Sequence, residues 1–134
     1  MNKIVGFLLL CCTFFACSKA DMGGNMPHFS EGTYSGTFQR QNLTSSAGSA
    51  ITLNFSAGNW HGSSTINKYP ALCEGTYMMT SSTISFVNTC TWAPDFDWSL
   101  ILEGTYEMTS YGDTIVLSKQ QNMNTIDIYK LKRM

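Results

Sequence analysis

The sequence predicts an all-β fold, an antiparallel up-and-down meander of about eight strands that closes into a small barrel. Three observations carry this prediction. The tetrapeptide Glu-Gly-Thr-Tyr begins at residues 31, 74 and 103, and after a turn the second and third copies lead into β-branched runs. Apolar and polar residues alternate with a period of two along most of the chain, as in strands that bury one face. No helical period is evident after residue 30.

The first half of the domain is expected to hold three strands. Residues 32–41 form the first, a polar loop follows over residues 41–48, and a tight turn at residues 57–59 separates the second strand from the third. The inward positions expected on these strands are Tyr34, Gly36 and Phe38, then Ile51, Leu53 and Phe55, then Trp60, Gly62 and Ser64. Gly36 and Gly62 fall in strand interiors, where a glycine indicates a bend or the close approach of another segment.

The second half is expected to hold the remaining strands, of which residues 98–108 form the longest. The expected inward positions are Gly75, Tyr77 and Met79, then Ile84 and Phe86, then Trp98, Leu100, Leu102, Gly104, Tyr106 and Met108, then Ile115 and Leu117, and finally Ile126, Ile128 and Lys130. Closure removes both edges of a sheet, which favours the barrel. A rolled-over two-sheet sandwich is the alternative.

The beginning of the chain resembles an export signal. Lys3 precedes an apolar stretch over residues 4–15 that is too short to cross a bilayer as a helix, so residues 1–16 are expected to be a signal peptide. The end of this stretch, Phe-Phe-Ala-Cys17, resembles the lipobox of bacterial lipoproteins. That resemblance implies lipidation of Cys17, a flexible tether over residues 17–30, and attachment to the outer membrane on a face that is left open. An ordinary signal peptide that releases a soluble protein is the alternative.

Two cysteines fall within the domain itself. Cys73 precedes one strand of a predicted hairpin and Cys90 follows its partner, so their sulfurs are expected to meet at the open ends of adjacent strands. A disulfide in an exported protein would then stabilise the domain by about 3 kcal/mol on the chain-entropy model. Two free buried thiols are the alternative. A metal site is not expected, because only His28 and His61 could add imidazole ligands.

Residues 31–134 as a whole resemble the lipocalin-like barrel domains of envelope lipoproteins from Bacteroidetes-type bacteria. The resemblance rests on the lipobox, the polar tether, the opening Gly32-Thr33-Tyr34 and the compact meander. Lipocalins open their first strand with Gly-x-Trp, and an arginine from the last strand packs across that tryptophan. Here Tyr34 would take the place of the tryptophan, and Arg133 would be the late arginine. The resemblance implies a barrel that binds a small molecule without transforming it.

The sequence offers no convergent set of catalytic residues. His28 lies on the expected tether and His61 points outward beside an inward tryptophan, so neither is placed for catalysis. The acidic side chains between residues 97 and 107 share the outward face of one expected strand, which is typical of a solvated surface. With a net charge of −1 and basic residues concentrated only at residues 130–133, no nucleic-acid partner is expected. We therefore expect a protein that is not an enzyme and that carries no cofactor or metal.

The remaining candidate site is the interior of the barrel. Its expected lining consists of inward aromatic and methionine side chains: Tyr34, Phe38, Phe55, Trp60, Tyr77, Met79, Phe86, Trp98, Tyr106 and Met108. These side chains either enclose a cavity for a small hydrophobic or amphipathic ligand or simply fill the barrel. The leading hypothesis is a lipid-anchored, non-enzymatic protein of the cell envelope that holds such a ligand. The alternative is a protein-interaction module, such as a protease or lysozyme inhibitor, that uses the Trp- and Phe-rich segment 92–98.

Overall fold

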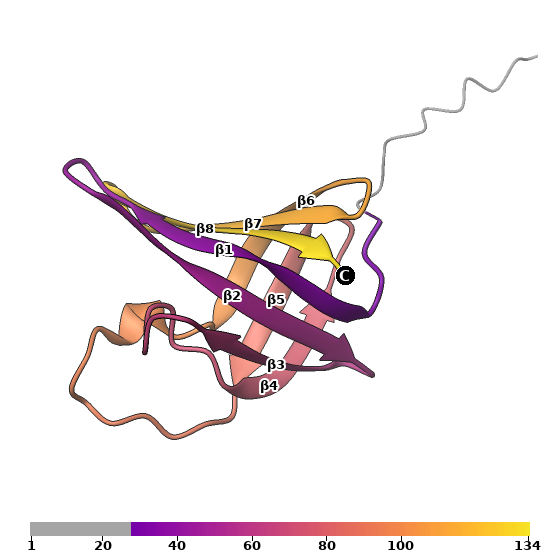
Figure 1. Cartoon of the computed structure of the whole chain (residues 1–134), viewed down its shortest axis with the longest axis horizontal. Helices are drawn as coiled ribbons and strands as arrows, with labels where there is room; N and C mark the ends of the chain where they lie inside the picture. Colours follow the sequence, from indigo (N-terminus) through magenta and orange to yellow (C-terminus); the bar gives the residue numbers. More distant parts are fainter. Residues whose placement is uncertain (1–27) are drawn as a thin grey trace, which may run out of the picture.

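Eight antiparallel strands follow one another around a closed barrel in the computed structural model, which describes residues 28–134 (Figure 1). The strands and one short 3-10 helix, η1, are β1 (Gly32–Gln41), β2 (Ser46–Ser56), β3 (Asn59–Ser64), β4 (Glu74–Met79), β5 (Thr83–Asn88), η1 (Trp98–Leu100), β6 (Gly104–Tyr111), β7 (Thr114–Asn122) and β8 (Thr125–Arg133). Each strand pairs with the next in the chain, and β8 pairs back onto β1. The predicted all-β meander and its closure into a barrel are therefore confirmed, and the two-sheet sandwich is excluded.

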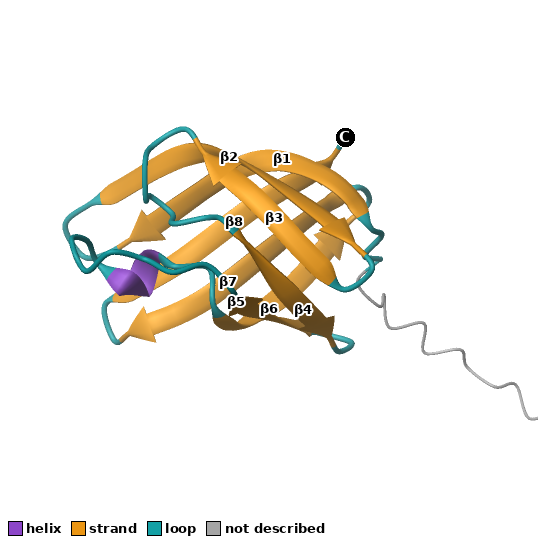
Figure 2. Cartoon of the chain, turned by 90° about the horizontal axis from the view of Figure 1, so that it is seen from below, coloured by secondary structure: helices purple, strands orange, loops and turns teal. Residues whose placement is uncertain are grey.

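The meander gives the barrel two different ends. One end, called the loop end, carries the connections at residues 42–45, 65–73, 89–103 and 123–124. The opposite end, called the turn end, carries the tight turns at residues 57–58, 80–82 and 112–113 together with the end of β8. The backbone N–H of His28 donates to Ser110 Oγ (2.8 Å), so the described chain also enters the barrel at the turn end. Figure 2 shows η1 and the end of β8 at opposite ends of the barrel.

Closure of the barrel depends on a close approach of β1 and β8. The two strands pair without interruption along almost the whole of β1. A β-carbon at Gly36 would overlap the carbonyl oxygen of Lys130 and would lie 2.9 Å from Leu131 Cα. Only glycine leaves room for this contact, so the close approach expected at Gly36 is confirmed.

The hairpin between β1 and β2 is longer than the sequence predicts. The prediction of a polar loop over residues 41–48 is wrong, because β2 begins at Ser46 and pairs there with Gln41. The turn is short because the side-chain oxygen of Asn42 accepts hydrogen bonds from the backbone N–H groups two and three residues later. Backbone pairing therefore extends both strands through residues whose polar side chains show no strand pattern.

The predicted strand over residues 98–108 is wrong in its first part, which forms η1. Asp97 caps this helix, since its carboxylate accepts a hydrogen bond from the backbone N–H of Ser99. The strand β6 begins only at Gly104. The three apolar residues that follow Ser99 are all buried, so the segment has no strand-like alternation between an inner and an outer face.

The last strand, β8, presents the opposite face to the interior from the one that its isoleucines predict. The inward placement is wrong for three residues: Ile126, Ile128 and Lys130. The side chains that do face the interior are Asp127, Tyr129 and Leu131. Both alternations of β8 contain apolar side chains, so the local pattern does not choose between them. An inward Asp127 is tolerated because Arg40 lies directly opposite it on β1.

The predicted disulfide between Cys73 and Cys90 is present, with 6.4 Å between the two Cα atoms. It joins the residue before β4 to the second residue after β5, and it therefore ties the start of the long β5–β6 connection to the barrel wall. For a closed loop with a sequence separation of 17, chain entropy gives a stabilisation of about 3 kcal/mol. Part of the loop end is thus fixed covalently.

Replacing Gly36 by alanine is expected to lower the free energy of unfolding by about 2–4 kcal/mol, because the added methyl group would push β8 away from β1. Urea unfolding followed by tryptophan fluorescence measures the loss. The control is Gly58→Ala in the turn between β2 and β3, where a β-carbon meets nothing within 4 Å and only the φ of 76° is unfavourable. A Gly36→Ala protein as stable as the control would contradict closure by backbone contact.

Candidate functional site

The interior of the barrel contains most of the side chains that the sequence assigns to a ligand cavity. Seven of the ten are almost completely buried: Tyr34, Phe38, Phe55, Trp60, Phe86, Tyr106 and Met108. Tyr77 and Met79 are partly buried and pack against this group. The structure therefore brings nine of the ten predicted residues together in one apolar cluster.

The tenth predicted cavity residue, Trp98, does not face the interior. Its side chain is 55% exposed on η1, and its indole N–H donates to the carbonyl oxygen of Ala93 (3.2 Å). The helical turn capped by Asp97 directs it out of the barrel. Trp98 belongs instead to the surface of the loop end.

Aromatic rings pack against one another along the interior. The ring centroid of Phe55 lies 5.6 Å from that of Tyr34 and 5.1 Å from that of Tyr77. The series continues through Phe86 and Tyr106, whose ring centroids are 5.6 Å apart. These contacts are edge-to-face, an arrangement that aromatic pairs prefer. These contacts join side chains of β1, β2, β4, β5 and β6 in one aromatic cluster.

Phe29 closes the turn end of the interior. Its ring centroid lies 5.1 Å from that of Phe55 and 5.8 Å from that of Tyr77. Residues 28–30, which the sequence places in the tether, therefore pack onto the barrel. The rest of the expected tether, including Cys17, lies outside the described residues, as does the expected signal peptide.

The first Glu-Gly-Thr-Tyr copy joins three parts of the turn end. The Tyr77 hydroxyl, from the second copy, donates to Glu31 Oε1 (3.0 Å), and burial together with this hydrogen bond raises the pKa of Tyr77 to about 12. The Arg133 guanidinium donates to the carbonyl oxygen of Glu31 (2.9 Å). It also lies against Gly32, where a β-carbon would be 3.3 Å from its Nε. The late arginine thus contacts the opening of β1.

An ion pair that the sequence pattern does not predict lies at the loop end of the interior. Arg40 on β1 binds Asp127 on β8 through two hydrogen bonds, from Nε to Oδ1 at 2.6 Å and from Nη2 to Oδ2 at 2.7 Å. Asp127 is 1% exposed and also accepts a hydrogen bond from Gln121 Nε2 (2.7 Å). The hydrogen bonds to Asp127 raise the pKa of the Arg40 guanidinium. This geometry satisfies a buried carboxylate that would otherwise destabilise the barrel.

Arg40 also holds η1 over the interior. Its Nη1 donates to Asp97 Oδ2 and to Ser99 Oγ, both at 2.9 Å, and its Nη2 donates to the Ser99 carbonyl oxygen at 3.0 Å. Hydrogen bonds from Ser99, with the charge of Arg40, lower the pKa of Asp97. Next to this contact, the backbone N–H of Ala71 donates to the Leu100 carbonyl oxygen (2.9 Å). Asp97, expected on a solvated face, therefore helps to hold η1 across the loop end. The hydrogen bonds from Arg40 to Asp97 and Ser99 are called the Arg40 latch below.

One further polar group lies in the interior. The Tyr106 hydroxyl is buried and has no hydrogen-bond partner among the described residues. Burial, and then the negative charge of Asp127, raises its pKa. Lys119 Nζ lies 5.4 Å from the centroid of the Tyr106 ring and donates to the Glu103 carbonyl oxygen (2.7 Å). The Tyr129 side chain and the Glu103 backbone act to lower the pKa of Tyr106, so other polar groups of the chain lie beside this hydroxyl.

Each connection at the loop end exposes a large apolar side chain. These are Leu43 at 81%, Ile66 at 48%, Trp98 at 55% and Met123 at 96% exposure. Lys68 Nζ lies 2.6 Å from Asp95 Oδ1 and 5.0 Å from the centroid of the Phe96 ring, so its charge is paired. Trp92 packs edge-to-face on Phe96, with 5.6 Å between ring centroids. The loop end therefore exposes one large apolar side chain on each connection, among polar residues, and its Lys68 and Arg40 are bound to aspartates of the same chain.

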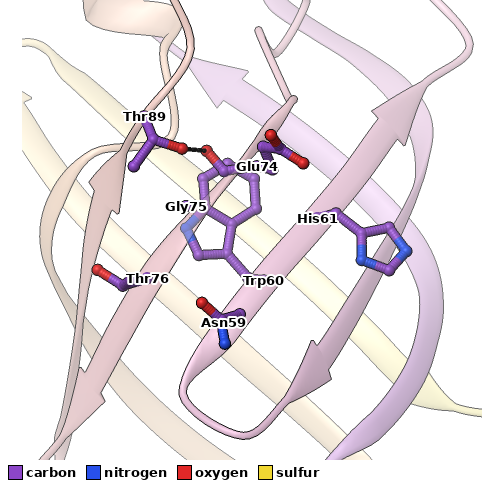
Figure 3. A pocket seen from close by; sticks show the side chains of 7 residues that line it. All are labelled: Asn59, Trp60, His61, Glu74, Gly75, Thr76 and Thr89. Carbon is purple, nitrogen blue, oxygen red and sulfur yellow. Dashed lines mark hydrogen bonds between the residues drawn. The ribbon is translucent and has the colours of Figure 1, made fainter.

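A shallow depression marks the seam where β3 and β4 pair over only three residues (Figure 3). It has a volume of about 340 Å³, and its lining residues are Asn59, Trp60, His61, Glu74, Gly75, Thr76 and Thr89. The Trp60 indole N–H donates to the Val87 carbonyl oxygen (3.4 Å), and Figure 3 shows His61 directed away from that indole. Thr89 Oγ1 donates to the Glu74 carbonyl oxygen (3.2 Å). These seven residues therefore do not form the hydrogen-bonded nucleophile and base that acyl transfer requires.

The described residues offer neither a metal site nor a membrane-spanning helix. Within residues 28–134, no group of three or more His, Cys, Asp or Glu side chains is placed to hold a metal ion. In the same part of the chain, no helix is long and apolar enough to cross a bilayer. No protein-family model, curated protein or solved structure matches the chain. The barrel is compatible with a lipocalin-like fold, and function has to be argued from its surfaces.

Arg40→Gln is expected to lower the free energy of unfolding by about 3–5 kcal/mol, because it leaves the Asp127 carboxylate buried without its partner. Chemical unfolding at neutral pH measures the change. The control, Asp97→Asn, removes the exposed partner of Arg40 and should cost at most about 1 kcal/mol. The double variant Arg40→Met with Asp127→Leu should recover most of the loss. A double variant no more stable than Arg40→Gln would contradict this account of the pair.

Proposed function

We propose that this chain is a lipid-anchored, non-enzymatic protein of the cell envelope that binds a partner protein through its loop end. The observation that carries the proposal is the exposed apolar side chain on each of the four loop-end connections. The lipid anchor is proposed from the lipobox-like sequence that ends at Cys17. Because the described chain enters the barrel at the turn end, an anchored molecule would hold its loop end away from the membrane.

The composition of the loop end supports a protein partner. The centres of protein–protein interfaces are depleted in free charge and enriched in aromatic and methionine side chains. Trp98 and Met123 are residues of these types. The lysine and the arginine nearby are each paired with an aspartate of the β5–β6 connection. A partner could therefore cover this surface without burying an unpaired cation.

The loop end is also held in one conformation, which favours binding to a folded partner. The Cys73–Cys90 disulfide fixes one side of the β5–β6 connection, and the Arg40 latch fixes the other. A parallel bridge between Ala71 and Ile101 joins this connection to the one before it. A surface that is ordered before binding loses less conformational entropy when the complex forms. An exogenous protease or lysozyme, inhibited by loops that cover its active site, is the class of partner that we propose.

A small hydrophobic or amphipathic ligand inside the barrel is the second candidate. The observation that favours it is the buried Tyr106 hydroxyl, which lacks a partner among the described residues. Met79 and Met108 are flexible side chains that could repack around such a ligand. Membership of the lipocalin-like envelope lipoproteins, proposed from the opening of β1 and the Arg133 contact to it, supports the same function. This candidate ranks second because the interior rings already pack on one another.

The protein partner should be reached from the loop end only. We expect a photo-crosslinking amino acid at Met123 to capture the partner in living cells, whereas the same group at Tyr111, on the turn end, should not. Replacing Leu43, Trp98 and Met123 together by serine should weaken binding of the captured partner on the order of 100-fold, as expected for the loss of central apolar contacts. Surface plasmon resonance with the captured partner measures the affinity.

The matched control replaces Met78, Tyr111 and Met134 by serine, which are comparably exposed but lie toward the turn end. This variant should bind the partner as the parent does. Equal weakening by both triple variants, or none by the loop-end variant, would contradict the proposal. If the barrel instead holds a ligand, the loop-end variant should retain that ligand unchanged.

A further inference from the structure

We infer that the rim of the turn end around Tyr111 is a membrane-contact surface, which rests in the headgroup region of a phospholipid bilayer. The rim consists of Tyr111, 71% exposed, with the side chain of Lys132, 69% exposed, and the adjacent Arg133. The inference rests on the proposed lipid anchor. It specifies which face of the barrel contacts the bilayer in an anchored molecule.

The fold holds this rim in place by backbone pairing. Tyr111 at the end of β6 and Lys132 on β8 are each paired with Thr114 at the start of β7. The backbone N–H of Arg133 donates to the carbonyl oxygen of Asp113 in the β6–β7 turn (2.8 Å). Tyr111, Thr114 and Lys132 therefore lie in one row across three paired strands, whereas Arg133, the next residue of β8, lies against Gly32 at the start of β1.

The chemistry of the rim suits the boundary between water and lipid. A tyrosine places its ring among the headgroups and its hydroxyl toward water, and long cationic side chains reach phosphate groups while their stems stay in apolar surroundings. Asp113 approaches Lys132 only to 3.6 Å, and both side chains are more than half exposed. Arg133 uses Nη2 to bind the Glu31 carbonyl oxygen. A phosphate group, which every phospholipid headgroup carries, would be a closer partner for Lys132 than Asp113 is.

The entry point of the chain indicates a bilayer rather than a second protein at this rim. His28 donates its backbone N–H to Ser110, the residue next to Tyr111. Ten residues lie between Cys17 and His28, so eleven Cα-to-Cα steps join the two. A chain of that length spans at most about 40 Å when fully extended. An acylated Cys17 would therefore keep the rim close to the membrane, where even weak interfacial contacts are populated because the local concentration is high.

The test uses the whole acylated chain, purified from membranes and reconstituted into vesicles of phosphatidylethanolamine and phosphatidylglycerol. Tyr111→Trp reports on the rim, and Met123→Trp, at a similarly exposed turn of the loop end, is the matched control. The three native tryptophans contribute equally to both variants. Lipids with brominated acyl chains quench a tryptophan that lies at the bilayer surface. We expect the bromine-dependent loss of fluorescence to be at least about twofold larger for Tyr111→Trp, and to fall when Lys132→Glu is added.

Flotation of the same vesicles distinguishes loss of the lipid anchor from loss of the membrane-contact surface. Chains that float with the vesicles but show equal quenching at both positions would overturn the membrane-contact surface and leave the anchor standing. Chains that do not float would overturn the anchor and, with it, the contact surface. Circular dichroism of each variant confirms that the barrel is folded before the fluorescence is compared.

Discussion

The ion pair between Arg40 and Asp127 links the closed barrel wall to the loop end. The pair bridges the first and last strands across a sequence separation of 87, at the seam where the meander closes. The same guanidinium binds Asp97 and Ser99, so sealing the barrel and folding η1 over it use one side chain. Removing either Arg40 or Asp127 alone leaves the other charge without its main partner, and an unpaired buried charge is strongly destabilising. A charged pair inside an otherwise aromatic barrel thus links its architecture to its outer surface.

The two ends of the barrel differ in chemistry, and the interior connects them. Aromatic rings pack on one another from Phe29 at the turn end to Tyr106 deeper inside, and we propose that binding takes place at the rims. The loop end exposes an apolar side chain on each connection, pairs Arg40 and Lys68 with aspartates, and is fixed by a disulfide and the Arg40 latch. The turn end receives the chain and carries the exposed side chains of Tyr111 and Lys132 in one row of paired residues. We propose that a molecule anchored through the turn end presents its loop end to a partner.

The sequence predicts most of the fold, because strands that bury one face leave a period of two and tight turns leave glycines. That pattern, together with the repeated Glu-Gly-Thr-Tyr units, correctly predicts the disulfide and nine of the ten interior side chains. The sequence does not predict which face of β8 points inward. Both sets of alternate residues on this strand contain apolar side chains, and Arg40, which permits an inward Asp127, is remote in the chain. The inward placement predicted for Trp98 is wrong because Asp97 caps a short helix where the sequence pattern indicates a strand. Whether inward aromatics enclose space or fill it is decided by ring-to-ring distances, which no local pattern contains.

Native mass spectrometry of the whole chain, purified gently from its own cells, tests most directly the claim that the interior is a core and that binding takes place at the ends. The account predicts only the mass of the chain with its covalent modifications, together with a protein partner that is lost when Leu43, Trp98 and Met123 are replaced by serine. A small molecule that is bound non-covalently and persists in that variant would contradict the account. It would place the binding site among the rings between Phe55 and Tyr106.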